Sequence, residues 1–363
     1  MNAAFQPDWK STARIRLGAI KQSALETTFR WRTLLPLLLQ ARKVTHALRD
    51  IKRHLPPGTP LVGVLLAEHI GDIVAAEPVI PYLKNKYAGA HLVWLSKPAF
   101  THLLRYHPQI DSLVEISSIS EAAHIVRSGI LDTAVDLHIN RKRCLKFGRP
   151  YAKRWGDTSV DIRNYYARGA LLEALSLSAG LPALTEQPRL YLGPISSTVD
   201  RYDLPKRYVV FHARSNELAR NWNDTAWTEL ARRLINQFGI SVVEVGLQRV
   251  ARIESPRYFD LCGKLSIVET AEVIRRASGF IGIDSGPAHI ANAFERPSVV
   301  LLGAYAAFPR YMPYTGFLRE NASDMVIQWP TACADIPVDE VVRRFGKLEA
   351  APRYAEVSDE LIS

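Results

Sequence analysis

The feature that most limits how this chain can fold is a strand–helix alternation that runs through it twice. The first series begins at Leu61 with the apolar run LVGVLLA, and the second begins at Arg207 with RYVVFHARS. In each series short β-branched runs alternate with segments of helical periodicity, which is typical of a parallel sheet with helices on both faces. We therefore predict an α/β protein with two Rossmann-like, doubly wound domains. Their strands would end at a central cleft, where ligands of this fold class bind.

The same pattern predicts the individual elements. In the first series we expect strands over 61–67, 90–96, 112–116 and 133–139, and helices over 78–87, 98–108, 121–129 and 164–180. In the second we expect strands over 207–215, 240–246, 279–285 and 298–303, and helices over 224–239, 266–278, 286–295 and 336–348.

A length of 363 residues suits two domains. We divide the chain into a basic, helical N-terminal extension, a first domain, a second domain, and a C-terminal helix with its tail. These four segments cover residues 1–58, 59–195, 196–335 and 336–363.

Composition excludes several classes of protein. Cys144, Cys262 and Cys333 form no CxxC pair and have no neighbouring pair of histidines, so we expect reduced thiols and neither a disulfide framework nor a zinc site. No apolar run approaches the roughly 18 residues of a membrane span. The N-terminus also lacks the pattern of a signal peptide. We expect a cytoplasmic protein.

The net charge of +10 is concentrated near the N-terminus, because residues 1–58 hold eleven Lys or Arg and only three acids. The stretch FRWRTLLPLLLQARKVTHALRDIKRHL alternates apolar and basic residues at loosely helical spacing. Such a segment can lie on an anionic membrane surface. The alternative is a helix hairpin that packs on the first domain with a solvated basic face.

A second basic cluster, NRKRCLKFGRPYAKRW, spans residues 140–155 with seven Lys or Arg and no acid. Basic clusters attract phosphate-bearing partners such as nucleic acids, anionic lipids and phosphorylated glycans. We do not expect either basic segment to bind nucleic acid by stacking on its bases. The alternative for this cluster is a solvated loop.

The turn after the first strand raises a question, because Asp72 of GDIV stands where a nucleotide-binding turn would normally cradle a phosphate. A carboxylate repels phosphate. The turn therefore holds either a residue with a chemical role or simply a cap for the helix that follows.

The strongest motif is FIGIDSGPAHIANAFERPSVVLLGA, residues 280–304. A buried strand ends at Asp284, and a helix follows whose free N–H groups and partial positive charge suit a diphosphate. Gly286 allows close approach, while Ser285 and His289 offer donors. Asp284 can hold the turn through backbone N–H groups. The alternative is a capped helix without a ligand.

These segments together resemble glycosyltransferase family 9, the ADP-heptose:lipopolysaccharide heptosyltransferases. The pattern D-S-G-x-x-H-x-A-x-A-x-x-x-P carries the likeness, with DLCGKLSIVETAEVIRRASGFIG before it, IGDIVAAEPVIPYLKNKYAGAHLVWL near the start, and AVDLHIN between them. The resemblance extends in order from residue 61 to about residue 345 and leaves out residues 1–58.

The resemblance implies the GT-B architecture and transfer with inversion at the anomeric carbon. It implies that Asp72 is the general base, which takes the proton of an acceptor hydroxyl as that hydroxyl attacks. The acceptor then lies on the first domain, beside Gly71 and the basic cluster. There the phosphorylated inner core of lipopolysaccharide would meet the cations, for which we select Arg141, Lys142, Arg143 and Lys146.

The resemblance assigns the nucleotide-sugar donor, expected to be ADP-linked, to the second domain. Ser215 and Arg220 match or adjoin the family's phosphate-binding positions, and the position of Leu265 contacts the base through its backbone. Gln248 stands where the family has an acid that binds the ribose. The donor residues are thus Ser215, Arg220, Gln248, Leu265, Asp284, Ser285, Gly286 and His289.

Two further features bear on the chemistry. The chain has no D-x-D motif, so we expect no metal and no cofactor beyond the donor itself. After LLGA the family commonly has Pro and a small hydroxyl residue, but here Tyr305 and Ala306 follow.

The sequence therefore predicts an inverting, metal-independent glycosyltransferase that moves heptose or a related sugar to a lipopolysaccharide-core or lipid-linked acceptor. We expect residues 1–58 to contact the cytoplasmic face of the inner membrane. One alternative is a transferase of the same fold that uses another nucleotide sugar and a protein or secondary-metabolite acceptor. Another is a non-catalytic module that binds membrane or nucleic acid.

Overall fold

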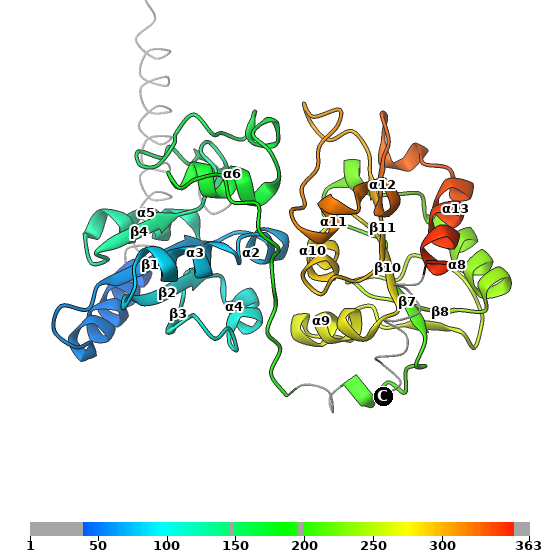
Figure 1. Cartoon of the computed structure of the whole chain (residues 1–363), viewed down its shortest axis with the longest axis horizontal. Helices are drawn as coiled ribbons and strands as arrows, with labels where there is room; N and C mark the ends of the chain where they lie inside the picture. Colours follow the sequence, from blue (N-terminus) through cyan, green and yellow to red (C-terminus); the bar gives the residue numbers. More distant parts are fainter. Residues whose placement is uncertain (1–38, 145–148, 195–198, 352–363) are drawn as a thin grey trace, which may run out of the picture.

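The computed structural model describes residues 39–144, 149–194 and 199–351, which form two α/β domains side by side (Figure 1). The predictions for residues 1–38 and for Lys146 lie outside these residues. An extended segment after α6 leads from the first domain to the second along their boundary (Figure 1).

The first domain is built on a four-stranded parallel sheet in the order β3-β2-β1-β4. Its strands are β1 (Leu61–Leu66), β2 (His91–Ser96), β3 (Ser112–Glu115) and β4 (Thr133–Asp136). β1 is buried along its whole length, as expected for a central strand of a sheet covered on both faces. The chain moves from β1 outward to β3 and then returns to the other side of β1, so the order reverses between β1 and β4.

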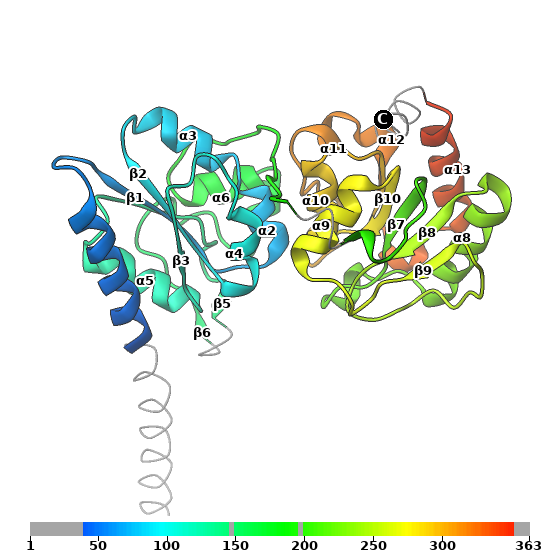
Figure 2. The ribbon, with the colours of Figure 1, turned by 90° about the horizontal axis from the view of Figure 1, so that it is seen from below.

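Helices cover both faces of this sheet (Figure 2). They are α2 (Ile70–Ala75), α3 (Val79–Lys86), α4 (Pro98–Leu104), α5 (Ile119–Ser128) and α6 (Leu171–Ser178), with a 3₁₀ turn η1 (Tyr165–Ala167) before α6. α5 illustrates how local sequence sets the boundaries: the Ser118 hydroxyl accepts from the Glu121 N–H, and Gly129 ends the helix in the left-handed region.

Residues 39–54 form a helix that packs beside α5 on one face of the sheet (Figure 2). Its buried side chains, Ala41, Val44, Thr45 and Leu48, recur at helical spacing, and Val44 and Leu48 join the core that includes Leu61, Leu65 and Val93. The opposite face carries exposed Arg42, Lys43, His46 and Arg49. This part of the N-terminal extension is therefore integrated with the first domain and turns a basic face outward.

The second domain is built on a six-stranded parallel sheet in the order β12-β11-β10-β7-β8-β9. Its strands are β7 (Tyr208–His212), β8 (Ser241–Glu244), β9 (Tyr258–Asp260), β10 (Gly279–Ile283), β11 (Ser298–Leu302) and β12 (Val326–Gln328). The order reverses between β7 and β10, so both domains share the doubly wound pattern.

The helices of this domain are α8 (Asp224–Phe238), α9 (Ile267–Arg276), α10 (Gly286–Ala293), α11 (Phe317–Glu320), α12 (Ala322–Met325) and α13 (Val338–Glu349), with 3₁₀ turns η2 (Leu218–Arg220) and η3 (Cys333–Asp335). α9 begins with a capping box formed by Ser266 and Glu269. α13 packs on α8 through Phe345 and Phe238, whose ring centroids are 5.2 Å apart.

The prediction of two Rossmann-like domains in a GT-B arrangement is confirmed, but some elements were missed. The basic cluster contains a short antiparallel pair, β5 (Arg143–Cys144) and β6 (Arg149–Pro150), and no strand was predicted at β9 or β12. The helix predicted over 164–180 is wrong in its first part, because Gly169 at φ +130° breaks it into η1 and α6.

Candidate active site between the two domains

The predicted site residues lie where the strand order reverses in each sheet. Asp72 follows β1 in the first domain, and Ser285 follows β10 in the second. The two turns meet, because α2 packs against α10 across the domain boundary (Figure 1). Reversal points at the carboxyl ends of parallel strands are where this fold class binds its ligands.

The contacts of Asp72 bear on both interpretations of this residue, as a helix cap and as a residue with a chemical role. Its Oδ2 accepts a hydrogen bond of 3.2 Å from the His69 N–H, so it caps the start of α2. Its side chain nevertheless remains 16% exposed, and Oδ1 lies 3.8 Å from the Nζ of Lys142. The interpretation of Asp72 as a helix cap is thus correct. The cap uses only one carboxylate oxygen, however, and the other faces Lys142.

Lys142 compensates the negative charge of two neighbouring carboxylates. Its Nζ forms an ion pair of 2.9 Å with Glu68 as well as the longer one with Asp72. Burial would raise the pKa of Asp72, but the nearby charge of Lys142, together with the hydrogen bond from the His69 N–H, lowers it below its ordinary value. Asp72 is therefore ionised at neutral pH, the state that a general base requires.

The backbone leading to Asp72 is anchored by a buried polar network. His138 Nε2 accepts from the Ala67 N–H at 2.8 Å, so its Nδ1 carries the proton and donates to Asp136 at 2.6 Å. Asp136 also accepts from Tyr151 Oη and Trp155 Nε1 at 2.8 and 2.6 Å. This network ties the end of β1 to the end of β4.

Lys153, from the same basic cluster, is buried and belongs to this framework. Its Nζ donates to the carbonyl oxygens of Asp136, His138 and Ser178. Burial lowers its pKa to about 8. The prediction that the cations of residues 140–155 attract a phosphate-bearing partner is therefore wrong for Lys153, which is held inside the domain.

The two turns approach closely because both contain glycine. A Cβ atom on Gly71 would lie 2.9 Å from His289 Cδ2, and one on Gly286 would overlap the Ile70 side chain. His289 also contacts Tyr314, with ring centroids 4.7 Å apart. Burial lowers the pKa of His289 despite the nearby carboxylates, so its imidazole is neutral at pH 7.

Ser285 is the N-cap of α10, but its side chain does not cap the helix. Its hydroxyl instead shares a hydrogen bond of 2.9 Å with His212 Nδ1 at the end of β7. Burial lowers the pKa of His212 to about 4, so this ring is neutral too. The Ser285 hydroxyl is thus held by a partner that the sequence did not identify.

Asp284 differs from its prediction. It does not hold the turn through backbone N–H groups; its carboxylate accepts from the hydroxyls of Tyr311 and Tyr314 at 2.9 and 3.1 Å, and pairs with Arg220 at 3.1 Å. Strand geometry points the buried carboxylate toward the loop 304–316 rather than along α10. Asp284 therefore positions Arg220.

Arg220 lies at the centre of the second domain's part of the site. Its guanidinium sits 4.1 Å above the Tyr305 ring, and its Nε is buried without a hydrogen-bond partner among the described residues. Burial opposes its charge, but Asp284 outweighs that effect and raises its pKa. An unpaired buried donor on a fixed cation suits an anionic ligand.

Aromatic side chains from both domains surround this cation. Tyr166 of η1 stacks on Tyr311 with ring centroids 4.8 Å apart, and Phe308 meets Tyr165 and Tyr166 edge-on at 5.4 and 5.5 Å. No periodic pattern in the sequence marks this group, since its members come from η1 and from the loop 304–316. The sequence feature that marks this region is Tyr305, which departs from the residues that the family commonly has after LLGA.

The remaining predicted residues lie on loops, except Arg143, which begins β5. The N–H of Ser215 donates to the side-chain oxygen of Asn221, so this group is already bonded within its own loop. Gln248 is exposed after β8, and Leu265 is half-buried before α9. Arg141 and Arg143 are exposed, with Arg141 Nε 3.7 Å from Asp161. The structure brings Lys142 to Asp72, and Arg220 to Asp284.

Sequence reasoning missed the residues that hold the site in place: Glu68, His69, His138, His212, Tyr311 and Tyr314. Glu68, His69 and His212 adjoin strand ends, which is the one sequence signal that could have marked them. Among the described residues, no three His, Cys, Asp or Glu side chains gather in a way that could hold a metal ion. Within the same residues, no helix has the length and apolar character needed to cross a membrane.

Comparison with known proteins decides the family. Residues 159–329 match the family model described as glycosyltransferase family 9 (heptosyltransferase). This part of the chain is a glycosyltransferase family 9 domain. The enzyme is therefore a glycosyltransferase, as predicted. The match includes η1, α6 and most of the second domain, whereas β1, Asp72 and Lys142 lie before it.

Individual relatives agree with this assignment. The enzyme is 24% identical over 277 residues to an Escherichia coli protein named lipopolysaccharide heptosyltransferase 3, which covers 64% of this chain and 81% of the relative. A family 9 glycosyltransferase structure from Veillonella parvula has a TM-score of 0.61 at 16% identity, covering 81% of this chain and 98% of that one. Escherichia coli ADP-heptose lipopolysaccharide heptosyltransferase II has a TM-score of 0.58 at 18% identity, covering 80% and 98%.

Proposed function

We propose that the enzyme transfers heptose, or a related sugar, from ADP-heptose to a lipopolysaccharide-core or lipid-linked acceptor, with inversion at the anomeric carbon. The observation that carries the proposal is the contact between the Asp72 turn and the α10 turn, supported by the names of the relatives. The contact brings an ionised carboxylate next to a helix start that suits a diphosphate.

The first domain supplies the base. The acceptor hydroxyl attacks the anomeric carbon from the face opposite the leaving diphosphate, and its proton passes to the free oxygen of Asp72. The bond between the anomeric carbon and the phosphate oxygen breaks as the new glycosidic bond forms. Because Asp72 is already ionised, it needs no prior proton loss, and such a base typically contributes about 10² to 10⁴ in rate.

The second domain stabilises the leaving ADP. Arg220 offers a fixed cation and an unpaired Nε–H, the start of α10 offers a partial positive charge, and neutral His289 offers at most one N–H. These groups supply positive charge to the diphosphate without a divalent cation, so we propose metal-independent transfer. Gly286 is covered by Ile70 in this arrangement, so the diphosphate enters beside Arg220 or when the turns separate.

Lys142 connects the base to an anionic acceptor. Its Nζ lies between Glu68 and Asp72 and belongs to the basic cluster of the first domain. A phosphorylated glycan or glycolipid would find this cation and the exposed Arg141 and Arg143 on the same segment. Of the acceptor cations predicted within the described residues, Lys142 is the one that forms an ion pair with the proposed base.

The outward face of helix 39–54 supports a peripheral position on the cytoplasmic face of the inner membrane. Arg42, Lys43 and Arg49 are exposed there, and each cation near an anionic surface contributes about 1 kcal/mol. Flotation with anionic vesicles would test this: we expect the full chain to float and Arg42→Glu/Lys43→Glu/Arg49→Glu to float less. Equal flotation would remove this face from the proposal.

The proposed function is tested by mixing the purified enzyme with lipopolysaccharide from a strain that lacks heptose and with ADP-heptose, UDP-glucose, GDP-mannose or CMP-linked sugars. We expect a mass increase of one heptose from ADP-heptose alone, an inverted anomeric configuration by NMR, and activity that persists in EDTA. Transfer from another donor would replace heptose and would agree with the change at Gln248. No transfer from any donor would contradict the proposal.

A further inference from the structure

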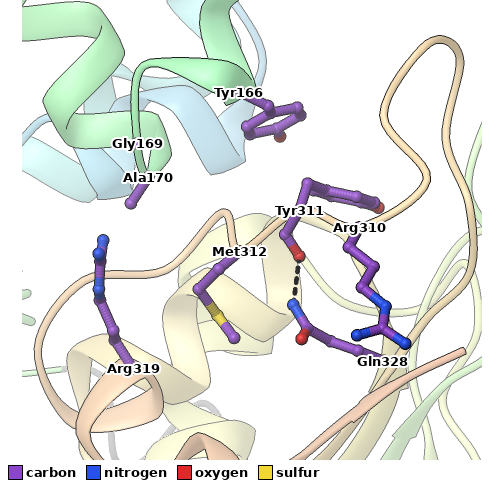
Figure 3. A pocket seen from close by; sticks show the side chains of 8 residues that line it. All are labelled: Tyr166, Gly169, Ala170, Arg310, Tyr311, Met312, Arg319 and Gln328. Carbon is purple, nitrogen blue, oxygen red and sulfur yellow. Dashed lines mark hydrogen bonds between the residues drawn. The ribbon is translucent and has the colours of Figure 1, made fainter.

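A pocket of about 250 Å³ lies between the two domains, outside the groups that the proposed mechanism uses (Figure 3). Its first-domain wall comes from η1 and the start of α6, and its second-domain wall comes from the loop before α11, from α11 itself and from β12. The lining residues are Tyr166, Gly169, Ala170, Arg310, Tyr311, Met312, Arg319 and Gln328.

The pocket is positively charged. Arg319 is paired with Glu173, which also accepts from the Ala170 N–H at 2.7 Å. Arg310 is exposed and has no ion pair or hydrogen bond with any residue in the described part of the chain. One arginine is therefore neutralised across the domain boundary, and the other is available to an anion.

The rest of the lining suits a sugar ring. Tyr166 and Tyr311 form an aromatic wall, with ring planes tilted by 34° to each other, and Met312 lies beside it (Figure 3). The Gln328 amide nitrogen donates to the Tyr311 carbonyl at 2.7 Å, which leaves its oxygen as an acceptor for hydroxyl groups. An aromatic surface with a few placed polar groups is typical of small-ligand sites.

The pocket is connected to the proposed donor site through one side chain. Tyr311 lines the pocket, and its hydroxyl donates to Asp284, the carboxylate that pairs with Arg220. A ligand in the pocket would therefore lie one residue away from the diphosphate-binding cation. Because both domains contribute to the wall, binding there would also favour the closed arrangement of the domains.

We propose that this pocket binds one negatively charged sugar unit, bearing a phosphate or carboxylate, with its anion on Arg310 and its ring against Tyr166. The volume suits a single ring, because pockets for drug-sized ligands start at about 300 Å³. This assignment rests on the proposed function: the unit is part of the acceptor glycan and lies beside the sugar to which the donor sugar is transferred.

Direct binding tests the pocket without requiring transfer. Glucose 6-phosphate and glucose are titrated calorimetrically into the full-length enzyme, with and without saturating ADP to occupy phosphate-binding groups at α10. We expect the phosphorylated sugar to bind and glucose to bind at least tenfold more weakly, since a charged hydrogen bond is lost. Arg310→Ala should weaken glucose 6-phosphate binding about tenfold or more, Arg310→Lys should restore part of it, and Arg232→Ala, an exposed control on α8, should change nothing.

Either equal binding by wild type and Arg310→Ala, or equal binding of glucose and glucose 6-phosphate, would overturn the pocket assignment. A transfer assay then separates this proposal from the proposed function. We expect Arg310→Ala to raise KM for the acceptor without changing KM for the donor. A wild-type enzyme that binds glucose 6-phosphate through Arg310 yet transfers no sugar would contradict the proposed function and leave the pocket standing.

Discussion

Gly71 and His289 lie in contact across the boundary between the two domains, so close that a Cβ atom on Gly71 would come within 2.9 Å of His289 Cδ2. Gly71 precedes the proposed base, and His289 lies in the first turn of α10, the helix proposed to face the donor. The contact therefore joins the two halves of the proposed site, and its closeness depends on the absence of a side chain at residue 71.

Gly71→Ala should reduce transfer while leaving each domain folded. The added methyl group meets buried His289 and the Gly286 backbone, and overpacking of this kind costs about 1–3 kcal/mol, equivalent to roughly 5- to 150-fold in the closed population. Turnover and the melting temperature would be measured together. Gly346→Ala, where a Cβ would lie 3.4 Å from the Phe238 ring, is the control and should keep full activity.

Lys142→Met should move the acidic limb of the pH–rate profile to higher pH. Burial raises the pKa of Asp72, and the charge of Lys142 is the largest influence that lowers it. Without that charge, Asp72 becomes protonated at a higher pH, and a protonated carboxyl cannot accept the acceptor's proton. The test is kcat/KM between pH 4 and 8; a limb that stays in place would show that Lys142 does not control the base.

Arg220→Lys should weaken ADP binding by about tenfold to a hundredfold, because the planar guanidinium over Tyr305 and its unpaired Nε–H are lost while the charge remains. Arg214→Lys is the matched control from the same segment, since Arg214 pairs with exposed Asp224. Calorimetry would measure both. Equal ADP affinities for the two variants would contradict a role for Arg220 at the diphosphate.

Asp136→Ala should destabilise the enzyme by about 3–5 kcal/mol at neutral pH, because removing one partner leaves buried donors unpaired. Burial opposes the ionised form, but His138 and Lys153 lower the pKa of Asp136. A lowered pKa contributes stability above the unfolded value of about 3.9 that is lost as pH falls toward the folded one. The deficit should therefore be constant near pH 7 and shrink below about pH 4, whereas exposed Asp50→Ala should cost about 1 kcal/mol or less.

Much of the fold and part of the site were predictable, because they depend on local patterns. Strand–helix alternation specified the two parallel sheets, and the glycines at residues 71 and 286 marked the turns where the strands end. Asp72 could be singled out because a carboxylate is unexpected at such a turn. These features follow from neighbouring residues in the chain.

The rest depends on contacts between distant segments. Nothing near Asp284 in sequence shows that it will pair with Arg220, since the pairing follows from the neighbouring positions of β10 and β7 in the sheet. From the sequence alone, Lys153 is expected to be a surface cation. In the fold, its Nζ donates to the carbonyl oxygen of Asp136 at the end of β4. The stack of Tyr166 on Tyr311 joins two loops from different domains, and loops carry no periodicity.

Asp72 is proposed to act as the base and not to bind the donor. Asp72→Asn keeps the size of the side chain and can still cap α2, so it removes chiefly the charge. ADP affinity and the single-turnover rate of transfer from ADP-heptose would be measured on this variant and the wild type. We expect unchanged or tighter ADP binding with a transfer rate lower by about 10² to 10⁴. Transfer at the wild-type rate by Asp72→Asn would contradict this proposal.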